Sequence, residues 1–101
     1  MKTTLLTKHD LAVIPKLYET EHIEIENKMI YVKLFTPWTN WTWYVIEFDG
    51  VDECFGFVKG IIAEFGYFSL KETAGVEGPF GLKVERDIHF KPTKVGDIQN
   101  W

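Results

Sequence analysis

Cysteine is nearly absent from this sequence: Cys54 is the only one in 101 residues. A single cysteine cannot form an intrachain disulfide, and zinc sites built from thiolates need several cysteines. A reducing compartment fits this cysteine usage best. Because Asp52 and Glu53 precede Cys54, their negative charge is expected to raise the pKa of the thiol, which argues against a reactive thiolate.

Long apolar runs and a basic excess are also missing. The longest apolar run is far shorter than a membrane span, and residues 1–10 lack the apolar centre of a signal peptide. We therefore expect a cytoplasmic protein that does not contact a membrane. The 11 Lys and Arg residues are outnumbered by 15 Asp and Glu residues, which gives a formal net charge of −4. Phosphate-binding surfaces are locally basic, so this balance argues against nucleic acid as a partner.

Aromatic residues, in contrast, are plentiful: the chain has eight Phe, four Tyr and four Trp. Aromatic side chains supply a large buried area per residue, which suits a short chain. A length of 101 residues predicts a single domain, residues 1–101, with a modest core. The sequence contains no nucleophile elbow, phosphate-binding loop or dinucleotide fingerprint that would point to a familiar enzyme class.

Two short helices are marked by capping signals. Thr7 is placed to cap the first helix, with Asp10 three residues later as in a capping box, and Pro15 is expected to end or kink it. Ser69 and Glu72 repeat this signal for the second helix.

Strands are predicted where β-branched and aromatic residues are concentrated, because these residues favour the pleated conformation. The predicted strands cover residues 29–36, 41–50, 53–60, 63–70 and 82–90, and a weaker extended piece covers residues 22–26. The connections between them are short, which favours antiparallel pairing. We therefore expect an α+β fold: a mainly antiparallel sheet of four to five strands with two short helices.

Four stretches in a fixed order carry a family resemblance: VKLFTPWTNWTWYVIEFD, FGFVKG, EFGYFSL and GLKVERDIHFKP. The chain resembles the bacterial domain-of-unknown-function family numbered 2958, which is carried on plasmids, conjugative elements and phages. The resemblance runs from about Leu5 to Pro92, with W-T-W followed by E-R-D-x-H-F as its paired signature. Trp38 departs from it, since a small or polar residue is expected there. The resemblance implies a setting on mobile DNA and no mechanism.

The last predicted strand, residues 82–90, carries four ionisable groups within five positions. Alternation places Arg86 on the same face as the apolar Val84 and Ile88. If that face packs on the core, Arg86 points inward and needs a carboxylate partner, because an unpaired buried charge is costly. Glu47 shares the apolar face of its own strand by the same alternation. We therefore predict a buried structural ion pair between Arg86 and Glu47.

Glu85, Asp87 and His89 occupy the other face of this strand, with neighbours about 7 Å apart. Two carboxylates and an imidazole could form the ligand set of a divalent metal or an acid–base catalytic group. The simpler interpretation is a solvated polar face, because no histidine spacing typical of metal sites accompanies them. His9 and His22 also lie without matching partners in the sequence. We accordingly expect no metal and no cofactor.

Tryptophans supply the first candidate for partner binding. Trp41 and Trp43 share one face of a predicted strand and are expected in the core, whereas Trp38 lies in the turn after Pro37. Two roles are open for Trp38: an exposed interface anchor, since Trp is enriched at binding hot spots, or a lid over the core. Stacking on single-stranded nucleic acid is a third option, but the sequence lacks the basic groove it requires.

An acidic segment is the second candidate for partner binding. It contains Glu19, Glu21, Glu24 and Glu26. Regularly spaced carboxylates can mimic DNA phosphates in inhibitors of DNA-binding proteins, although four are few for that role. A charged edge that discourages strand pairing is the simpler interpretation.

These observations lead to three hypotheses about function. The first is a small non-enzymatic interaction module of a mobile element, which binds an unknown host protein and inhibits host defence or DNA processing. The second is a small enzyme or metal-binding domain that uses Glu85, Asp87 and His89, and the third is a single-strand nucleic-acid binder. Convergent acids in a cleft around His89 would favour the enzyme, and a flat exposed strand would favour the interaction module.

Overall fold

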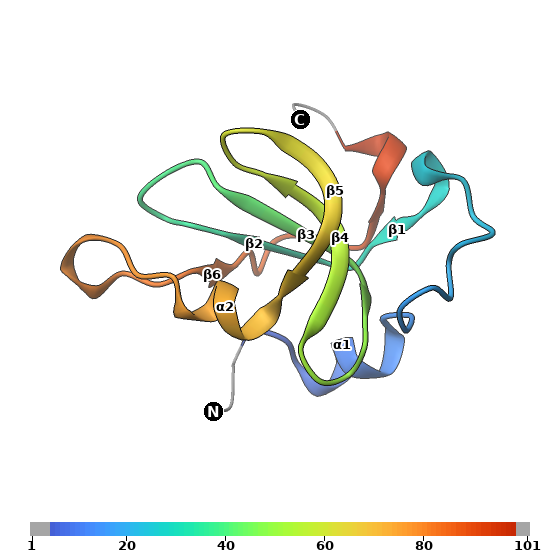
Figure 1. The fold of residues 1–101 in the computed structure, drawn as a ribbon, viewed down its shortest axis with the longest axis horizontal. Helices are drawn as coiled ribbons and strands as arrows, with labels where there is room; N and C mark the ends of the chain where they lie inside the picture. Colours follow the sequence, from blue (N-terminus) through green and yellow to red (C-terminus); the bar gives the residue numbers. More distant parts are fainter. Residues whose placement is uncertain (1–4, 99–101) are drawn as a thin grey trace.

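The computed structural model describes residues 5–98, in which two antiparallel sheets are accompanied by two short helices (Figure 1). This arrangement confirms the α+β class expected from the sequence. The larger sheet has the strand order β5-β4-β3-β2-β6. Its strands are β2 (Val32–Phe35), β3 (Thr42–Phe48), β4 (Glu53–Lys59), β5 (Ala63–Ser69) and β6 (Glu85–Arg86). The smaller sheet pairs β1 (Met29–Ile30) with β7 (Thr93–Lys94).

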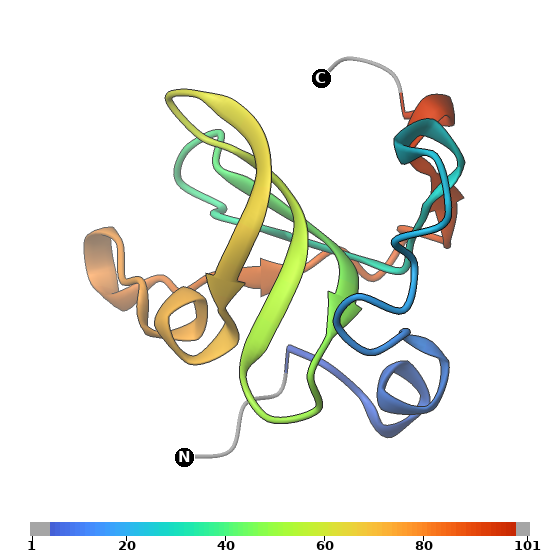
Figure 2. The ribbon, with the colours of Figure 1, turned by 45° about the vertical axis from the view of Figure 1, so that its right-hand side comes forward.

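The two helices begin where the capping signals place them. In α1 (Lys8–Val13), Thr7 and Asp10 form a reciprocal capping box. In α2 (Leu70–Gly75), the Ser69 side chain accepts a hydrogen bond from the backbone N–H of Glu72 at 3.1 Å. Both helices lie at the end of the sheet where β3 turns into β4 (Figure 2).

Three single-turn 3-10 helices complete the secondary structure of the described residues: η1 (Ile25–Asn27), η2 (Pro79–Gly81) and η3 (Val95–Asp97). The extended piece expected over residues 22–26 is therefore wrong, because turns and η1 occupy that segment. No helix within residues 5–98 combines the length and the apolar character needed to cross a bilayer.

Each face of the larger sheet carries its own hydrophobic core. One core contains Leu34 and Trp43 from the sheet, and it is closed by Leu5, Leu70 and Val84. The other core is mainly aromatic and is closed by the C-terminal segment; its buried members are Ile30, Tyr44, Ile46, Phe57 and Val95. With a core on both faces, the middle strand β3 is buried along nearly its whole length.

A β-bulge in β3 changes which face its last residues occupy. Val45 lies opposite Gly56, but Glu47 lies opposite Phe55, so Ile46 is the extra residue. At Gly56 an added Cβ would lie 1.8 Å from the carbonyl oxygen of Tyr44, so this close approach requires glycine. The bulge turns Glu47 onto the face of Phe55, opposite to the face that simple alternation predicts.

The strand predicted over residues 82–90 is much shorter in the structure. Pairing with β2 is confined to Glu85 and Arg86, and the chain turns at Ile88 and His89. Ile88, expected to face the core, is 80% exposed because it lies in this turn. Phe90, beyond the turn, packs on the second core.

Candidate functional site

A protruding loop, residues 77–83, carries the most exposed aromatic side chain of the described chain. Phe80 is wholly exposed, with a relative exposure of 102%. Its φ of 58° lies in the left-handed region, which bulky side chains rarely adopt. This loop extends outward at one end of the long axis, where it is coloured orange in Figure 1.

Several local contacts hold this loop in one shape. Glu77 and Lys83 form a β-bridge and an ion pair of 3.2 Å across its base. The Gly78 N–H donates to the Leu82 carbonyl at 2.8 Å, and the Leu82 N–H donates to the Pro79 carbonyl at 3.1 Å. Phe80 is therefore presented on a preformed backbone.

Trp38 lies against the same loop. A Cβ added at Gly78 would sit 2.3 Å from Trp38 Cδ2, so the indole packs directly on the glycine backbone. Trp38 is half-buried, which matches neither a freely exposed anchor nor a full lid over the core. Its position instead joins the loop after β2 to the loop that carries Phe80.

A groove of about 290 Å³ lies beside Trp38. Three tryptophans and Val76 give it an apolar lining, completed by two threonines and Glu77; its members are Thr36, Trp38, Thr39, Trp41, Trp43, Val76 and Glu77. Among these lining residues, Glu77 alone is ionisable. Such a lining suits an apolar side chain better than a charged substrate.

The structure separates the two tryptophans that were predicted to share the core. Trp43 is buried, but Trp41 is 38% exposed and lies just before β3 begins. The two rings lie 6.0 Å apart, and the outer ring of Trp41 covers Gly60 at the β4–β5 turn. Trp41 is therefore a wall of the groove rather than a core residue.

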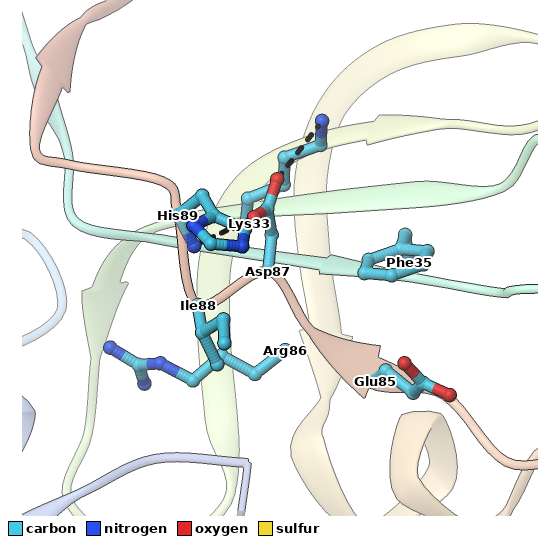
Figure 3. A pocket seen from close by; sticks show the side chains of 7 residues that line it. All are labelled: Lys33, Phe35, Glu85, Arg86, Asp87, Ile88 and His89. Carbon is cyan, nitrogen blue, oxygen red and sulfur yellow. Dashed lines mark hydrogen bonds and ion pairs between the residues drawn. The ribbon is translucent and has the colours of Figure 1, made fainter.

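The predicted polar face of Glu85, Asp87 and His89 borders a separate hollow of about 390 Å³. Figure 3 shows the Glu85 carboxylate pointing away from Asp87 and His89. Within residues 5–98, no three His, Cys, Asp or Glu side chains converge so as to hold a metal. The three side chains therefore line one hollow without forming a ligand set.

Asp87 already has structural partners in this hollow. One carboxylate oxygen accepts the backbone N–H of His89 at 2.9 Å, which forms the turn that ends β6. The other lies 3.6 Å from the Lys33 ammonium on the neighbouring strand. The carboxylate of Asp87 therefore stabilises the turn after β6 and the pairing of β6 with β2.

The predicted ion pair between Arg86 and Glu47 is wrong, because Arg86 pairs with a different carboxylate. Arg86 does point inward, but it pairs with Asp10: its Nη2 lies 3.0 Å from Asp10 Oδ1, and its Nη1 binds Asp10 Oδ2. The bulge in β3 has turned Glu47 to the other face of the sheet, out of reach of Arg86. Burial alone would raise the pKa of Asp10, but the hydrogen bonds from Arg86 and Thr7 and the charge of Arg86 hold it below its ordinary value.

Glu47 is buried, as predicted, but it organises a different segment. Its carboxylate accepts the backbone N–H groups of Tyr18 at 2.8 Å and Thr20 at 3.1 Å, and it also binds the Thr20 hydroxyl. Lys28, which is buried too, donates to the same hydroxyl at 2.8 Å. Tyr18, which donates its N–H to this carboxylate, has a φ of 71°.

The acidic segment lies far from Trp38. Glu19, Glu21, Glu24 and Glu26 are all exposed, in the part of the chain that runs along the opposite end of the long axis (Figure 1). Glu19 accepts the backbone N–H of Lys16 at 2.6 Å and so closes a local turn. The two candidates for partner binding therefore cannot belong to one small binding surface.

Phe80 was not singled out from the sequence. It stands within Gly78-Pro79-Phe80-Gly81, a turn composition in which apolar residues are uncommon. An aromatic residue flanked by such turn formers is the signal that could have identified it.

Comparison with known proteins places the chain in a family but gives it no function. No curated protein and no solved structure matches it. One family model matches residues 5–99, which is nearly the whole chain. The chain therefore belongs to the family described as proteins of unknown function, DUF2958.

Proposed function

We propose that this protein is a non-enzymatic binding module that captures another protein with Phe80 and the adjacent tryptophan groove. The observation that carries this proposal is the wholly exposed Phe80 on a left-handed backbone. Left-handed geometry at a bulky residue costs about 1–3 kcal/mol. In the free protein the exposed ring gains no energy from burial that could offset this strain. Burial of the ring against a partner would supply such an offset.

The surroundings of Phe80 have the features of a binding hot spot. Aromatic anchors on a rigid backbone lose little conformational entropy when they bind. The groove beside Trp38 offers a complementary apolar recess for a side chain of the partner. The ring and the recess lie next to each other because Trp38 packs on Gly78 of the Phe80 loop.

The charges near this site favour a protein partner. Glu77 and Lys83 neutralise each other at the base of the loop, so the site lacks the basic groove that follows a phosphate backbone. We further propose that the partner is a host-cell protein involved in defence or DNA processing. This part of the proposal rests on the setting that the family resemblance implies, in which small accessory proteins bind and inhibit host machinery.

The test uses variants that distinguish the loss of the Phe80 ring from a loss of folding. Phe80→Asn removes the ring, and asparagine tolerates the left-handed backbone, so the melting temperature should stay equal or rise. Trp38→Ala removes the support under the loop. The control is Val51→Asn, at a residue that is 77% exposed in the β3–β4 turn.

Partners captured from a host lysate by the wild-type protein are identified by mass spectrometry, and the affinity of each variant for the purified partner is then measured. We expect Phe80→Asn and Trp38→Ala to weaken binding roughly tenfold or more and Val51→Asn to leave it unchanged. Wild-type affinity in a folded Phe80→Asn variant would overturn the proposal.

A further inference from the structure

Strand β5 forms an unprotected edge of the larger sheet. It is seven residues long and, within residues 5–98, pairs only with β4, without a register shift. It contains no proline and no lysine, and Glu64 is its only charged residue. Natural sheets usually protect a long edge with such residues, because free backbone groups recruit other strands. The opposite edge, β6, is only two residues long and needs no such protection.

The backbone hydrogen bonds at the two ends of the β4–β5 hairpin show which groups of β5 face outward. At the ends of the β4–β5 hairpin, Leu70 N–H donates to the Asp52 carbonyl at 2.8 Å and Gly60 N–H donates to the Ile62 carbonyl at 3.1 Å. Hydrogen-bonded and non-bonded pairs alternate along an antiparallel ladder. Even-numbered residues of β5 therefore turn their backbone groups toward β4. The N–H and C=O groups of the odd-numbered residues Ala63, Phe65 and Tyr67 therefore face the free edge. Ser69 contributes only its N–H, because its carbonyl accepts the Thr73 hydroxyl of α2 at 2.9 Å.

We infer that β5 pairs with β5 of a second copy of this chain, antiparallel, about a two-fold axis at Gly66. This register uses all seven residues of the strand. It places Phe65 of one copy opposite Tyr67 of the other, and Ala63 opposite Ser69. The Phe65/Tyr67 pairs can exchange both of their hydrogen bonds, and each Ala63/Ser69 pair can form one from the Ser69 N–H, so about six hydrogen bonds would form across the axis.

Side chains match as well as backbone groups in this register. Phe65 and Tyr67 would form two aromatic cross-strand pairs, which stabilise antiparallel sheets. Glu64 falls opposite Phe68 of the other copy, so no like charges face each other along the paired strands. The strand is thus complementary to itself, which identifies a second copy as its occupant.

The contact would also cover apolar side chains beyond the strand. Ile61 and Ile62, at the tip of the β4–β5 hairpin, are 92% and 71% exposed. The register extends this tip toward α2 of the second copy, beside Leu70 and Lys71. A seven-residue strand is only about 23 Å long, and stable dimers bury about 800 Å² per partner, so these extra contacts matter. We expect a dimer of micromolar affinity.

Gly66 is an independent reason to place the axis there. A Cβ added at Gly66 would meet no atom within 4 Å, so no contact inside the described chain requires a glycine. Glycine weakens a strand and often marks a close approach of another backbone. At the proposed axis the two Gly66 residues would face each other as the closest pair of the new ladder.

The same glycine provides the test. The open space at Gly66 should let Gly66→Lys and Gly66→Glu fold normally, which circular dichroism checks. In a dimer, each substitution would place like charges directly opposite each other. We expect either variant alone to dimerise about tenfold more weakly than the wild-type protein, and an equimolar mixture of the two to recover the dimer.

Sedimentation velocity over about 5–500 µM, a range that brackets the expected affinity, measures the assembly of each protein. Ile88→Lys is the control, because it adds the same charge at a residue that is 80% exposed beside the opposite edge. A wild-type monomer throughout the range would overturn the inference. So would open-ended assembly, an unchanged dimer in Gly66→Lys, or failure of the mixture to recover the dimer. Pairing of β5 with a strand of a different protein only would appear as a wild-type monomer.

Discussion

Asp10 and Arg86 form a bidentate ion pair that joins α1 to β6 of the larger sheet. Arg86 Nη1 also donates to the Leu5 carbonyl at 3.0 Å. Asp10 is buried and, at the same time, completes the capping box of α1 by accepting the Thr7 N–H at 2.7 Å. One carboxylate thus fixes both the start of a helix and the position of that helix against the sheet.

Removing either member of this pair should destabilise the fold strongly. We expect Arg86→Ala to lower the free energy of unfolding by about 3–5 kcal/mol, because it leaves the buried Asp10 charge unpaired. Lys83→Ala, which breaks the exposed pair with Glu77, should cost less than about 1 kcal/mol. Urea unfolding of both variants measures the difference. Equal stabilities would contradict the structural role of Arg86.

The same pair predicts how stability depends on pH. The pKa of Asp10 is below its ordinary value of 3.8 in the folded protein, so the unfolded chain binds the proton more readily. The stabilisation by Asp10 is therefore complete above about pH 5 and is lost as the pH falls through 3.8 and then through the lower folded pKa. We expect the stability difference between wild type and Asp10→Asn to shrink from pH 7 to pH 3. A constant difference would rule this out.

Glu47 should matter for a different segment of the chain. Glu47→Ala removes the acceptor for Tyr18, Thr20 and, through the Thr20 hydroxyl, the buried Lys28. We expect a loss of about 3–5 kcal/mol in the free energy of unfolding. If the loss comes from the isolated Lys28 charge, adding Lys28→Met should recover part of it, as a double-mutant cycle would show. Additive losses would argue against coupling.

The two neighbouring tryptophans should respond differently to truncation. Trp43→Ala empties a buried site and should cost about 3–5 kcal/mol of stability. Trp41→Ala should cost about 1 kcal/mol, because that ring is partly exposed and forms the groove wall. Thermal melting of the two variants distinguishes these expectations. A similarly large loss of stability in both would show that Trp41 contributes to the core as Trp43 does.

Cys54 should be unreactive in the folded protein. Burial, assisted by the charges of Asp49, Asp52 and Glu53, raises the pKa of its thiol to about 12. A thiol-reactive dye at pH 8 should therefore label the native protein only as fast as the protein unfolds, and labelling in urea should be rapid. Fast labelling of the native state would show that Cys54 is more accessible than its burial indicates.

The sequence by itself determined the features that depend on neighbours along the chain. Thr7 and Ser69 cap their helices through groups three residues away, so their roles could be recognised directly. Strands β3, β4 and β5 were likewise foreseen, because alternation and β-branched or aromatic content are properties of each segment. The inward direction of Arg86 followed from the same alternation. Glu47 is buried as well, but on the face opposite to the one that alternation predicted.

Tertiary structure alone decided which distant groups meet. The bulge at Ile46 moved Glu47 to the other face of the sheet, and Arg86 found its counter-ion on α1 instead. The turn at Asp87 separated Glu85 from His89, and the contact of Trp38 with Gly78 positioned Phe80. A one-residue change of register reverses every later side chain of a strand. Local patterns therefore predict the elements, whereas the partners depend on a register that the assembled sheet sets.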